Sequence, residues 1–307
     1  MDKPHRAVGP GDDSAPPAGK SAHSAVPKKF DRLARLVGGG GIEKLLHSHV
    51  AVIGLGGVGS YVAEGLARSG VGRLTLVDFD EVCVTNFNRQ LHAVEGNIGK
   101  AKAVLMESRV LAINPRCEVR SVLKFYEKVT SEEILSPAPD IVVDCIDNLT
   151  AKLHLLFSCV ERGIPVVSSL GASGRLDPTR ISVAPLTDTY ADPLGQALRK
   201  NLRRKYKMPD EAMEKVVAVF SDEPPTWPVQ DYRSSLCGTD CVCPNAANQH
   251  HTCQRRHVIH GSSVFVTATF GMVAAAAVVR HLAGLPPIQP RPDSQRTGYV
   301  HRRKKPA

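Results

Sequence analysis

Short apolar runs alternate with amphipathic stretches along the chain from about residue 50 to residue 168. The apolar runs have the length of strands, and the stretches between them repeat apolar residues at the spacing of a helix. This alternation predicts βαβ units, and therefore an α/β fold with a mostly parallel sheet flanked by helices. We also expect a C-terminal extension of this sheet. The predicted strands are residues 50–53, 73–78, 118–123, 140–144 and 164–168, and the predicted helices are residues 60–69, 100–113 and 149–162.

Residues 262–279 form a long segment without a charged side chain. The segment is rich in Ala, Thr and Gly rather than Leu, and its length is marginal for crossing a bilayer. We therefore predict a turn followed by a helix buried against the sheet, and no membrane span.

The composition changes at both ends of this region. Residues 1–28 are rich in Pro, Ala, Gly, Ser and Lys, and residues 286–307 are rich in Pro, Lys and Arg. Neither segment can bury enough apolar area to fold, so we predict two disordered tails around one domain at residues 29–285. The opening residues lack the apolar stretch of a signal peptide, which predicts a cytoplasmic protein.

The chain is basic, with 39 Lys and Arg against 30 Asp and Glu and a net charge of +9. This excess favours an anionic partner such as a nucleotide or RNA. The eight Cys residues, in a chain without an export signal, favour reduced thiols or metal ligands over disulfides.

A glycine-rich turn directly follows the first predicted strand and opens the first predicted helix. Its glycines are Gly54, Gly56, Gly57 and Gly59. Glycines let a backbone approach a phosphate closely, and a helix N-terminus offers free N–H groups to an anion. Asp78 ends the next strand, where an acidic residue can bind ribose hydroxyls. Together these features predict a Rossmann-like nucleotide site.

The residues that follow Asp78 point to ATP rather than NAD. They include Asp80, Asn86, Arg89, Gln90 and Lys102. Cations close to the phosphates would neutralise a triphosphate and its leaving pyrophosphate, which hydride transfer does not need. Asp147 follows the predicted strand 140–144, at the sheet edge where a doubly wound fold builds its site. A carboxylate there can hold Mg²⁺ against phosphate oxygens.

These motifs resemble the adenylating domain of the ubiquitin-activating-enzyme superfamily. The matching stretches are GxGGxGS at 54–60, LxDxD at 76–80, NxNRQ at 86–90, GxxK at 99–102, INP at 113–115 and DCIDN at 144–148. The resemblance implies that the glycines cradle ATP, that Asp78 binds ribose, and that Asn86, Arg89 and Lys102 hold the phosphates beside Gln90. It also implies that Asp147 carries Mg²⁺, and that the protein is a homodimer in which Arg35 reaches the partner's ATP.

Stretches outside this nucleotide site resemble the tRNA threonylcarbamoyladenosine dehydratases of the same superfamily, over about residues 29–284. They lie at residues 30, 34–36, 82–86, 89–92, 171–174, 176–179, 192–194 and 266–271. This resemblance implies adenylation of the threonyl carboxylate of a modified adenosine beside the tRNA anticodon. Ring closure with loss of AMP would follow, and the neighbouring carbamoyl group would attack within the same molecule.

Three other functions remain as alternatives. An adenylyltransferase for the C-terminus of a ubiquitin-like sulfur carrier would use the same ATP residues, and would bring a sulfur-acceptor or cysteine-desulfurase partner. A nucleotide-binding scaffold without activity, or an NAD oxidoreductase, is less favoured because Arg89, Lys102 and Asp147 are all present.

A basic stretch lies within the predicted helix at about residues 193–207. Its six cations are Arg199, Lys200, Arg203, Arg204, Lys205 and Lys207. On a helix, Arg199 and Arg203 share one face, and Lys200, Arg204 and Lys207 share another. Such a stripe predicts contact with an RNA backbone, with an ordinary solvated helix face as the alternative.

The segment 222–260 is a Cys-rich loop that contains Cys237, Cys241, Cys243 and Cys253. Four thiolates can bind Zn²⁺ tetrahedrally, although the spacing is not that of two CxxC pairs. Structural zinc, reactive sulfur and free thiols therefore remain open, with possible substitute ligands at His250, His251, His257 and His260. The other cysteines, Cys83, Cys117, Cys145 and Cys159, lie in or beside predicted elements and are expected to be small buried apolar residues.

Overall fold

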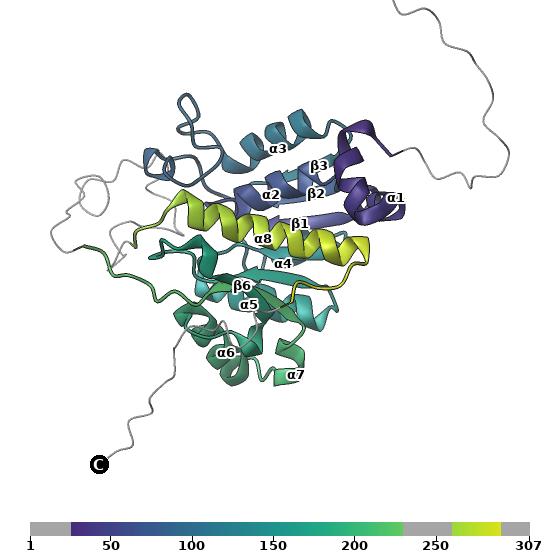
Figure 1. Cartoon of the computed structure of the whole chain (residues 1–307). Helices are drawn as coiled ribbons and strands as arrows, with labels where there is room; N and C mark the ends of the chain where they lie inside the picture. Colours follow the sequence, from purple (N-terminus) through teal and green to yellow (C-terminus); the bar gives the residue numbers. More distant parts are fainter. Residues whose placement is uncertain (1–25, 230–259, 290–307) are drawn as a thin grey trace, which may run out of the picture.

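The computed structural model describes residues 26–229 and 260–289, which fold around one seven-stranded sheet (Figure 1). The strand order is β3-β2-β1-β4-β5-β7-β6. Neighbouring strands are parallel, except that β6 runs antiparallel to β7 at one edge. The strands are β1 His49–Ile53, β2 Arg73–Val77, β3 Glu118–Val122, β4 Ile141–Asp144, β5 Val166–Ser169, β6 Ile181–Pro185 and β7 Val216–Ser221.

Helices cover both faces of the sheet. They are α1 Asp31–His47, α2 Gly59–Arg68, α3 Lys102–Ile113, α4 Ser131–Ile134, α5 Leu149–Glu161, α6 Pro193–Lys205, α7 Asp210–Met213 and α8 Val264–Ala283. Short 3₁₀ helices lie at Lys28–Phe30, Val84–Asn86, Pro178–Arg180 and Leu186–Asp188. Helices α1, α2, α3 and α8 pack in one layer, and α5 and α6 pack in the other.

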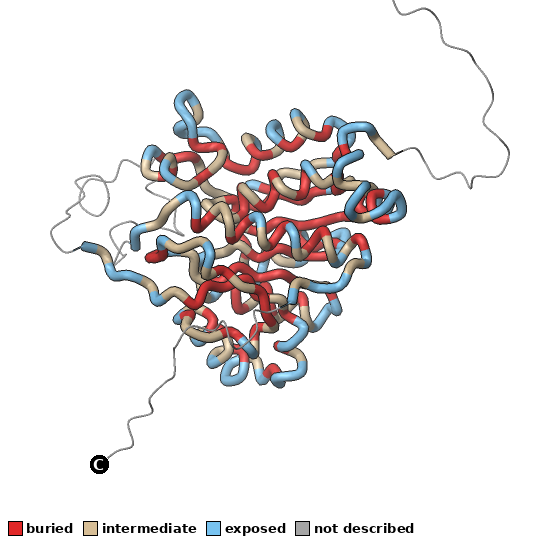
Figure 2. The backbone as a smooth tube through the Cα atoms, viewed as in Figure 1, coloured by how far each residue is buried: buried red, intermediate tan, exposed pale blue. Residues whose placement is uncertain are grey.

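The central strand β1 shows why the sheet is covered on both sides. All five of its residues are buried, as Figure 2 shows for the middle of the sheet. Val50 and Val52 point into the cluster formed with α2 and α8, whereas Ala51 and Ile53 point into the cluster formed with α5. Successive side chains of a strand face opposite ways, so a strand buried on both faces reads as a continuous apolar run. The predicted fold class is confirmed.

Helix α8 is long and apolar enough to cross a membrane by length and composition. Here it is a core helix, because Val266, Phe270 and Val278 belong to the main hydrophobic cluster. It packs closely on α2, where a Cβ added at Gly271 would lie 2.6 Å from the carbonyl oxygen of Val58. The predicted helix buried against the sheet is confirmed.

Three features differ from the sequence prediction. Helix α1 was not predicted, and β6 and β7 were expected only as an unspecified C-terminal extension of the sheet. The described structure also reaches slightly beyond residues 29–285, because Val26 and Ile288 pack against the hydrophobic core.

Candidate functional site

The glycine-rich turn joins β1 to α2 and packs closely against the loop that follows β4. Gly54 has φ +91°, and a Cβ at this position would lie 2.9 Å from the carbonyl oxygen of Cys145. A Cβ at Gly59 would lie 1.8 Å from the carbonyl oxygen of Gly54, which no side chain can tolerate. The turn therefore needs glycine for its own geometry. The N–H groups of Ser60, Tyr61 and Val62 donate to carbonyl oxygens of Gly56 and Val58, so the turn itself stabilises the start of α2. The turn lies at the positive end of that helix, where an anion is favoured.

Asp78 ties the end of β2 to this turn. Its Oδ2 accepts the N–H of Leu55 at 2.7 Å, and its Oδ1 accepts the N–H of Asp80 at 2.8 Å. Burial raises the pKa of Asp78 above its ordinary value, although the nearby Lys102 charge acts in the opposite direction. Asp78 thus lies at the carboxyl end of β2, next to the turn, as the sequence predicted.

Lys102 begins α3 and is buried, with its Nζ 2.9 Å from Oδ2 of Asp80. Burial alone would lower the pKa of Lys102, but the carboxylates of Asp78, Asp80 and Asp147 outweigh it and hold the pKa above its usual value. Lys102 therefore stays cationic, and the three carboxylates lie within electrostatic range of it. The structure brings these four predicted residues together.

Asp147 is exposed in the loop that follows β4. Fully buried Lys152 fastens this loop, because its Nζ lies 2.7 Å from Oδ2 of Asp144 and donates to the carbonyl oxygen of Ile146 at 3.0 Å. Asn148 then caps α5 by accepting two main-chain N–H groups. The exposed carboxylate of Asp147 therefore lies in a loop whose position is fixed by the buried side chains of Lys152 and Asp144.

The segment between β2 and α3 supplies the other predicted residues. The Asn86 side chain accepts the N–H of Cys83 at 3.0 Å, and Arg89 donates to the carbonyl oxygen of Thr85 at 2.7 Å. A Cβ at Gly57 would lie 3.2 Å from Cγ of Arg89, and one at Gly56 would lie 3.8 Å from Nε2 of Gln90. Arg89 and Gln90 therefore pack directly against the glycine turn.

His92 is a residue of this site that the motif analysis did not single out. It is 4% exposed, and neither ring nitrogen has a hydrogen-bond partner within the described part of the chain. Burial, assisted by the Lys102 charge, lowers the pKa of His92 to about 4. The imidazole is therefore neutral near pH 7. In the sequence, His92 appeared only as the last residue of the stretch 89–92 that carries the family resemblance, two residues after Gln90.

The described residues contain no group of three or more His, Cys, Asp and Glu side chains disposed to hold a metal ion. A Mg²⁺ ion shared with a nucleotide has a smaller requirement, because it uses one or two carboxylates together with phosphate oxygens. Asp80 and Asp147, which both act electrostatically on Lys102, fit that requirement.

The predicted zinc ligands Cys237, Cys241, Cys243 and Cys253 lie outside the described residues, as do His250, His251 and His257. Among the other cysteines, Cys83, Cys117 and Cys159 are buried as expected, and Cys145 is partly buried.

Arg35 does not join the other predicted residues within one chain. It lies on α1, which begins where Phe30 packs on Gly70, beyond the C-terminal end of α2. The glycine turn is at the opposite end of α2. Arg35 is exposed and pairs with Asp31 at 3.0 Å, so its predicted action on a partner's ATP stays a prediction.

The predicted basic stripe is only partly correct. Helix α6 ends at Lys205, so Lys207 lies beyond it. Arg199 is half-buried and donates to Thr189 and to the carbonyl oxygen of Leu186, because α6 packs this side of the helix inward. Arg203 forms two hydrogen bonds with Asp210, at 2.7 and 3.0 Å. The outward cations of α6 that are not engaged in this way are Lys200, Arg204 and Lys205, all exposed.

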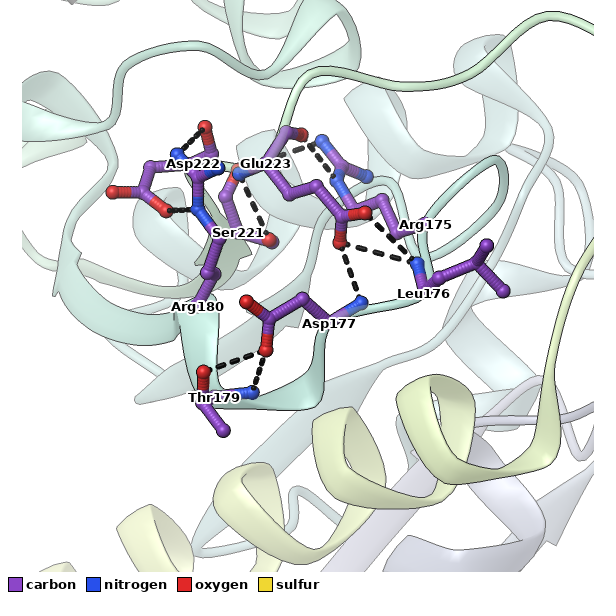
Figure 3. A network of polar contacts seen from close by, with 8 residues as sticks. All are labelled: Arg175, Leu176, Asp177, Thr179, Arg180, Ser221, Asp222 and Glu223. Carbon is purple, nitrogen blue, oxygen red and sulfur yellow. Dashed lines mark hydrogen bonds and ion pairs between the residues drawn. The ribbon is translucent and has the colours of Figure 1, made fainter. Parts of the chain in front are cut away.

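The loops after β5 and β7 form a second polar region on the same edge of the sheet, drawn in Figure 3. Buried Arg175 lies 2.7 Å from Oδ2 of Asp192 and donates through Nε to the carbonyl oxygen of Glu223 at 3.0 Å. The Glu223 carboxylate accepts the N–H groups of Leu176 and Asp177. The sequence analysis did not single out Arg175 or Glu223, because only the folded chain brings them together.

Comparison with known proteins matches a model of the ThiF family to residues 30–302. The tRNA threonylcarbamoyladenosine dehydratase of Bacillus subtilis (strain 168) is 38% identical over 255 residues, which are 83% of this chain and 94% of that protein. The crystal structure of the Escherichia coli tRNA N6-threonylcarbamoyladenosine dehydratase in complex with ATP superposes with a TM-score of 0.71 at 35% identity, covering 84% of this chain and 94% of that one. The molybdopterin-synthase adenylyltransferase of Haemophilus influenzae is 34% identical over 165 residues, but these are only 53% of this chain.

Proposed function

Because this chain belongs to the ThiF family, we propose that it is an ATP-dependent tRNA threonylcarbamoyladenosine dehydratase. The reaction would join the threonyl carboxylate of the modified adenosine to AMP and then close a ring. The observation that carries the proposal is the convergence of Asp78, Lys102 and Asp147 on the glycine turn. The similarity to the Bacillus subtilis dehydratase over 94% of that protein's length supports this substrate over a sulfur-carrier protein.

In the first step a carboxylate oxygen of the substrate attacks the α-phosphorus of ATP, and pyrophosphate leaves. Lys102 and Arg89 would neutralise the phosphate charge, and Asp78 would accept hydrogen bonds from the ribose. Asp147, with Asp80 nearby, would hold a Mg²⁺ ion, which would supply further neutralisation of the phosphate charge. The cation of Lys102 is preset for this role, since the surrounding carboxylates keep it charged.

In the second step the carbamoyl group attacks the activated carbonyl carbon, loses a proton, and AMP leaves with the former carboxylate oxygen. The net change in the nucleoside is the loss of one water. Attacking and attacked atoms belong to one molecule, so proximity supplies much of the rate without an enzyme nucleophile.

Mass spectrometry of tRNA nucleosides after incubation with ATP tests the proposal. Wild-type protein should convert threonylcarbamoyladenosine into a product lighter by one water, whereas Asp147→Ala should not. Glu214→Ala, which removes an exposed carboxylate beyond α7, serves as the matched control and should retain conversion. An unchanged nucleoside with wild-type protein would refute the substrate. ATP–pyrophosphate exchange stimulated only by a ubiquitin-like carrier would favour the alternative.

We also infer a cytoplasmic homodimer in which Arg35 acts on the partner's ATP. Arg35 lies on α1, whose start packs beyond the C-terminal end of α2, whereas the glycine turn is at the N-terminal end of α2. This separation is consistent with action across an interface. Subunit mixing tests this. Arg35→Ala and Asp147→Ala homodimers should both be inactive, and an exchanged mixture should regain roughly a quarter of wild-type activity, because half the dimers contain one complete site. A mixture that stays inactive after confirmed exchange would contradict action across the interface.

A further inference from the structure

Trp227 is the only tryptophan of the chain, and its side chain is exposed in the segment that follows β7. The residue is 72% exposed, which is unusual for the largest apolar side chain. Its indole lies beside the imidazole of His260, with 5.7 Å between the ring centroids and an angle of 43° between the rings. Two aromatic rings are therefore presented together to the outside.

Main-chain hydrogen bonds connect three segments next to these two residues. The N–H of Thr226 donates to the carbonyl oxygen of Gly174 at 2.7 Å, and the N–H of Gly174 donates to that of Gly261 at 2.8 Å. Gly174 has φ +73°, and a Cβ there would lie 2.9 Å from the carbonyl oxygen of Thr226. The segment before Trp227 and the segment after His260 are thus hydrogen-bonded to the same glycine, Gly174, in the loop that follows β5.

The polar network of Figure 3 includes Arg175, the residue after Gly174, and Glu223, three residues before Thr226. Arg175, 2% exposed, holds the main chain at Glu223 and pairs with Asp192 at the start of α6. Ser263 in turn donates to the carbonyl oxygen of Arg175 at 3.3 Å. Buried charged groups therefore set the position of a pair of exposed rings that contribute little to the core.

The rings lie next to the phosphate side of the nucleotide site. Asn88 donates to the carbonyl oxygen of Ser262 at 2.8 Å, and Arg89 donates to the Asn88 side chain at 2.9 Å. Thr267, one turn into α8, packs against Gly57. The segment that carries His260 therefore adjoins the loop of Asn88 and Arg89.

We propose that Trp227, together with His260, is a stacking surface for an unpaired base of a single-stranded RNA loop that carries the reacting carboxylate. The proposal rests on the proposed function. Proteins bind unpaired RNA bases mainly on aromatic faces, which accept any base and add binding energy without a hydrogen-bond code. The basic character of the chain suits the same partner. Trp227 would then position the modified nucleoside for attack and leave ATP binding unaffected.

Intrinsic fluorescence tests this directly, because all tryptophan emission of the protein comes from this position. The probe is an anticodon stem-loop RNA that carries threonylcarbamoyladenosine, with a fully paired RNA hairpin of equal length as the control. The stem-loop should quench the emission with a saturable curve, and the paired hairpin should quench it weakly. Quenching by a ubiquitin-like carrier protein but not by the stem-loop would overturn the proposal in favour of a protein partner.

Kinetics of two variants separate stacking from folding. Trp227→Ala should raise the KM for tRNA about 10- to 100-fold and leave the KM for ATP unchanged, whereas Trp227→Phe should stay within a few-fold of wild type because it keeps an aromatic face. Both should unfold at the wild-type temperature. An unchanged KM for tRNA in Trp227→Ala would refute the stacking role while wild-type conversion still upheld the proposed function. No conversion by wild-type protein would instead refute the proposed function itself.

Discussion

The ammonium group of Lys152 lies 2.7 Å from a carboxylate oxygen of Asp144, and neither side chain has any exposed surface. The pair has further partners, since Ser168 donates to Asp144 at 2.7 Å and Lys152 donates to the carbonyl oxygen of Ile146. A buried ion pair returns little net stability, because removing both charges from water costs about what their attraction regains. The pair instead fixes the position of the loop that contains Asp147, because Lys152 also holds the main chain at Ile146.

Replacing one member of this pair should be costly. Lys152→Met should lower the free energy of unfolding by about 3–5 kcal/mol, because it leaves the Asp144 carboxylate buried without its cation. The double variant Asp144→Asn/Lys152→Met should recover most of this loss, since no unpaired charge remains. Urea unfolding of the three proteins measures both effects. A double variant no more stable than Lys152→Met would contradict the unpaired charge as the cause of the loss.

The glycine turn contains positions with opposite requirements. Gly59→Ala should strongly destabilise the protein, because its Cβ would lie 1.8 Å from the carbonyl oxygen of Gly54. Gly56→Ala should fold normally, since the nearest atom to its Cβ is Nε2 of Gln90 at 3.8 Å, but the added methyl group should weaken ATP binding by obstructing the approach to the phosphates. Thermal unfolding and ATP titration distinguish the two. Wild-type ATP affinity in Gly56→Ala would place the phosphates elsewhere.

His92 should make stability depend on pH. Its folded-state pKa is about 4, whereas the unfolded chain takes up this proton near pH 6.5. As the pH falls below 6.5, the unfolded state binds more protons, so stability should be lost progressively down to pH 4, by up to roughly 3 kcal/mol. His92→Phe should lack this component. The difference between wild-type and variant unfolding energies at pH 7 and pH 4.5 measures it, and equal pH dependence would contradict the buried neutral imidazole.

The outward cations of α6 should contribute to RNA binding in a salt-dependent way. Arg204→Glu should weaken tRNA binding, and should make the slope of log affinity against log salt shallower by about one to two units. Arg203→Glu is the matched control with the same change of charge, and it should have a smaller effect, because Asp210 already engages the Arg203 side chain. ATP affinity should be unchanged in both. Equal tRNA affinity for Arg204→Glu and wild type at physiological salt would show that this face of α6 is merely solvated.

Buried apolar runs and a glycine turn of fixed spacing were enough to predict the parallel strands β1 to β5 and the grouping of Asp78, Lys102 and Asp147. These signals are local, and parallel strands bring their carboxyl ends to one edge without further information. Helix α1 was missed because four successive glycines, residues 38–41, oppose a helical assignment, and Gly38 does interrupt it with φ +77°.

The remainder depends on tertiary packing. Helical spacing placed Arg199 and Arg203 on one face, but it could not show that the Arg199 side of α6 turns inward while Asp210 engages Arg203. His92 is buried, and Arg175 bonds to the main chain at Glu223, 48 residues later. Both features depend on contacts between distant segments, so no local sequence pattern predicts them. Local rules therefore predicted the nucleotide half better than the rest of the site.

The residues assigned to the nucleotide and the loops after β5 and β7 belong to separate parts of the chain, with the division at the start of α5. Every residue assigned to the nucleotide lies before Leu149, whereas the loops after β5 and β7 come later and are built on the neighbouring strands of the same sheet. Evolution could thus retain one phosphate-activating module and exchange the second half to admit a different acid. A hybrid joined within α5, with its later part taken from a relative that acts on another substrate, would keep its ATP chemistry and change its choice of acceptor.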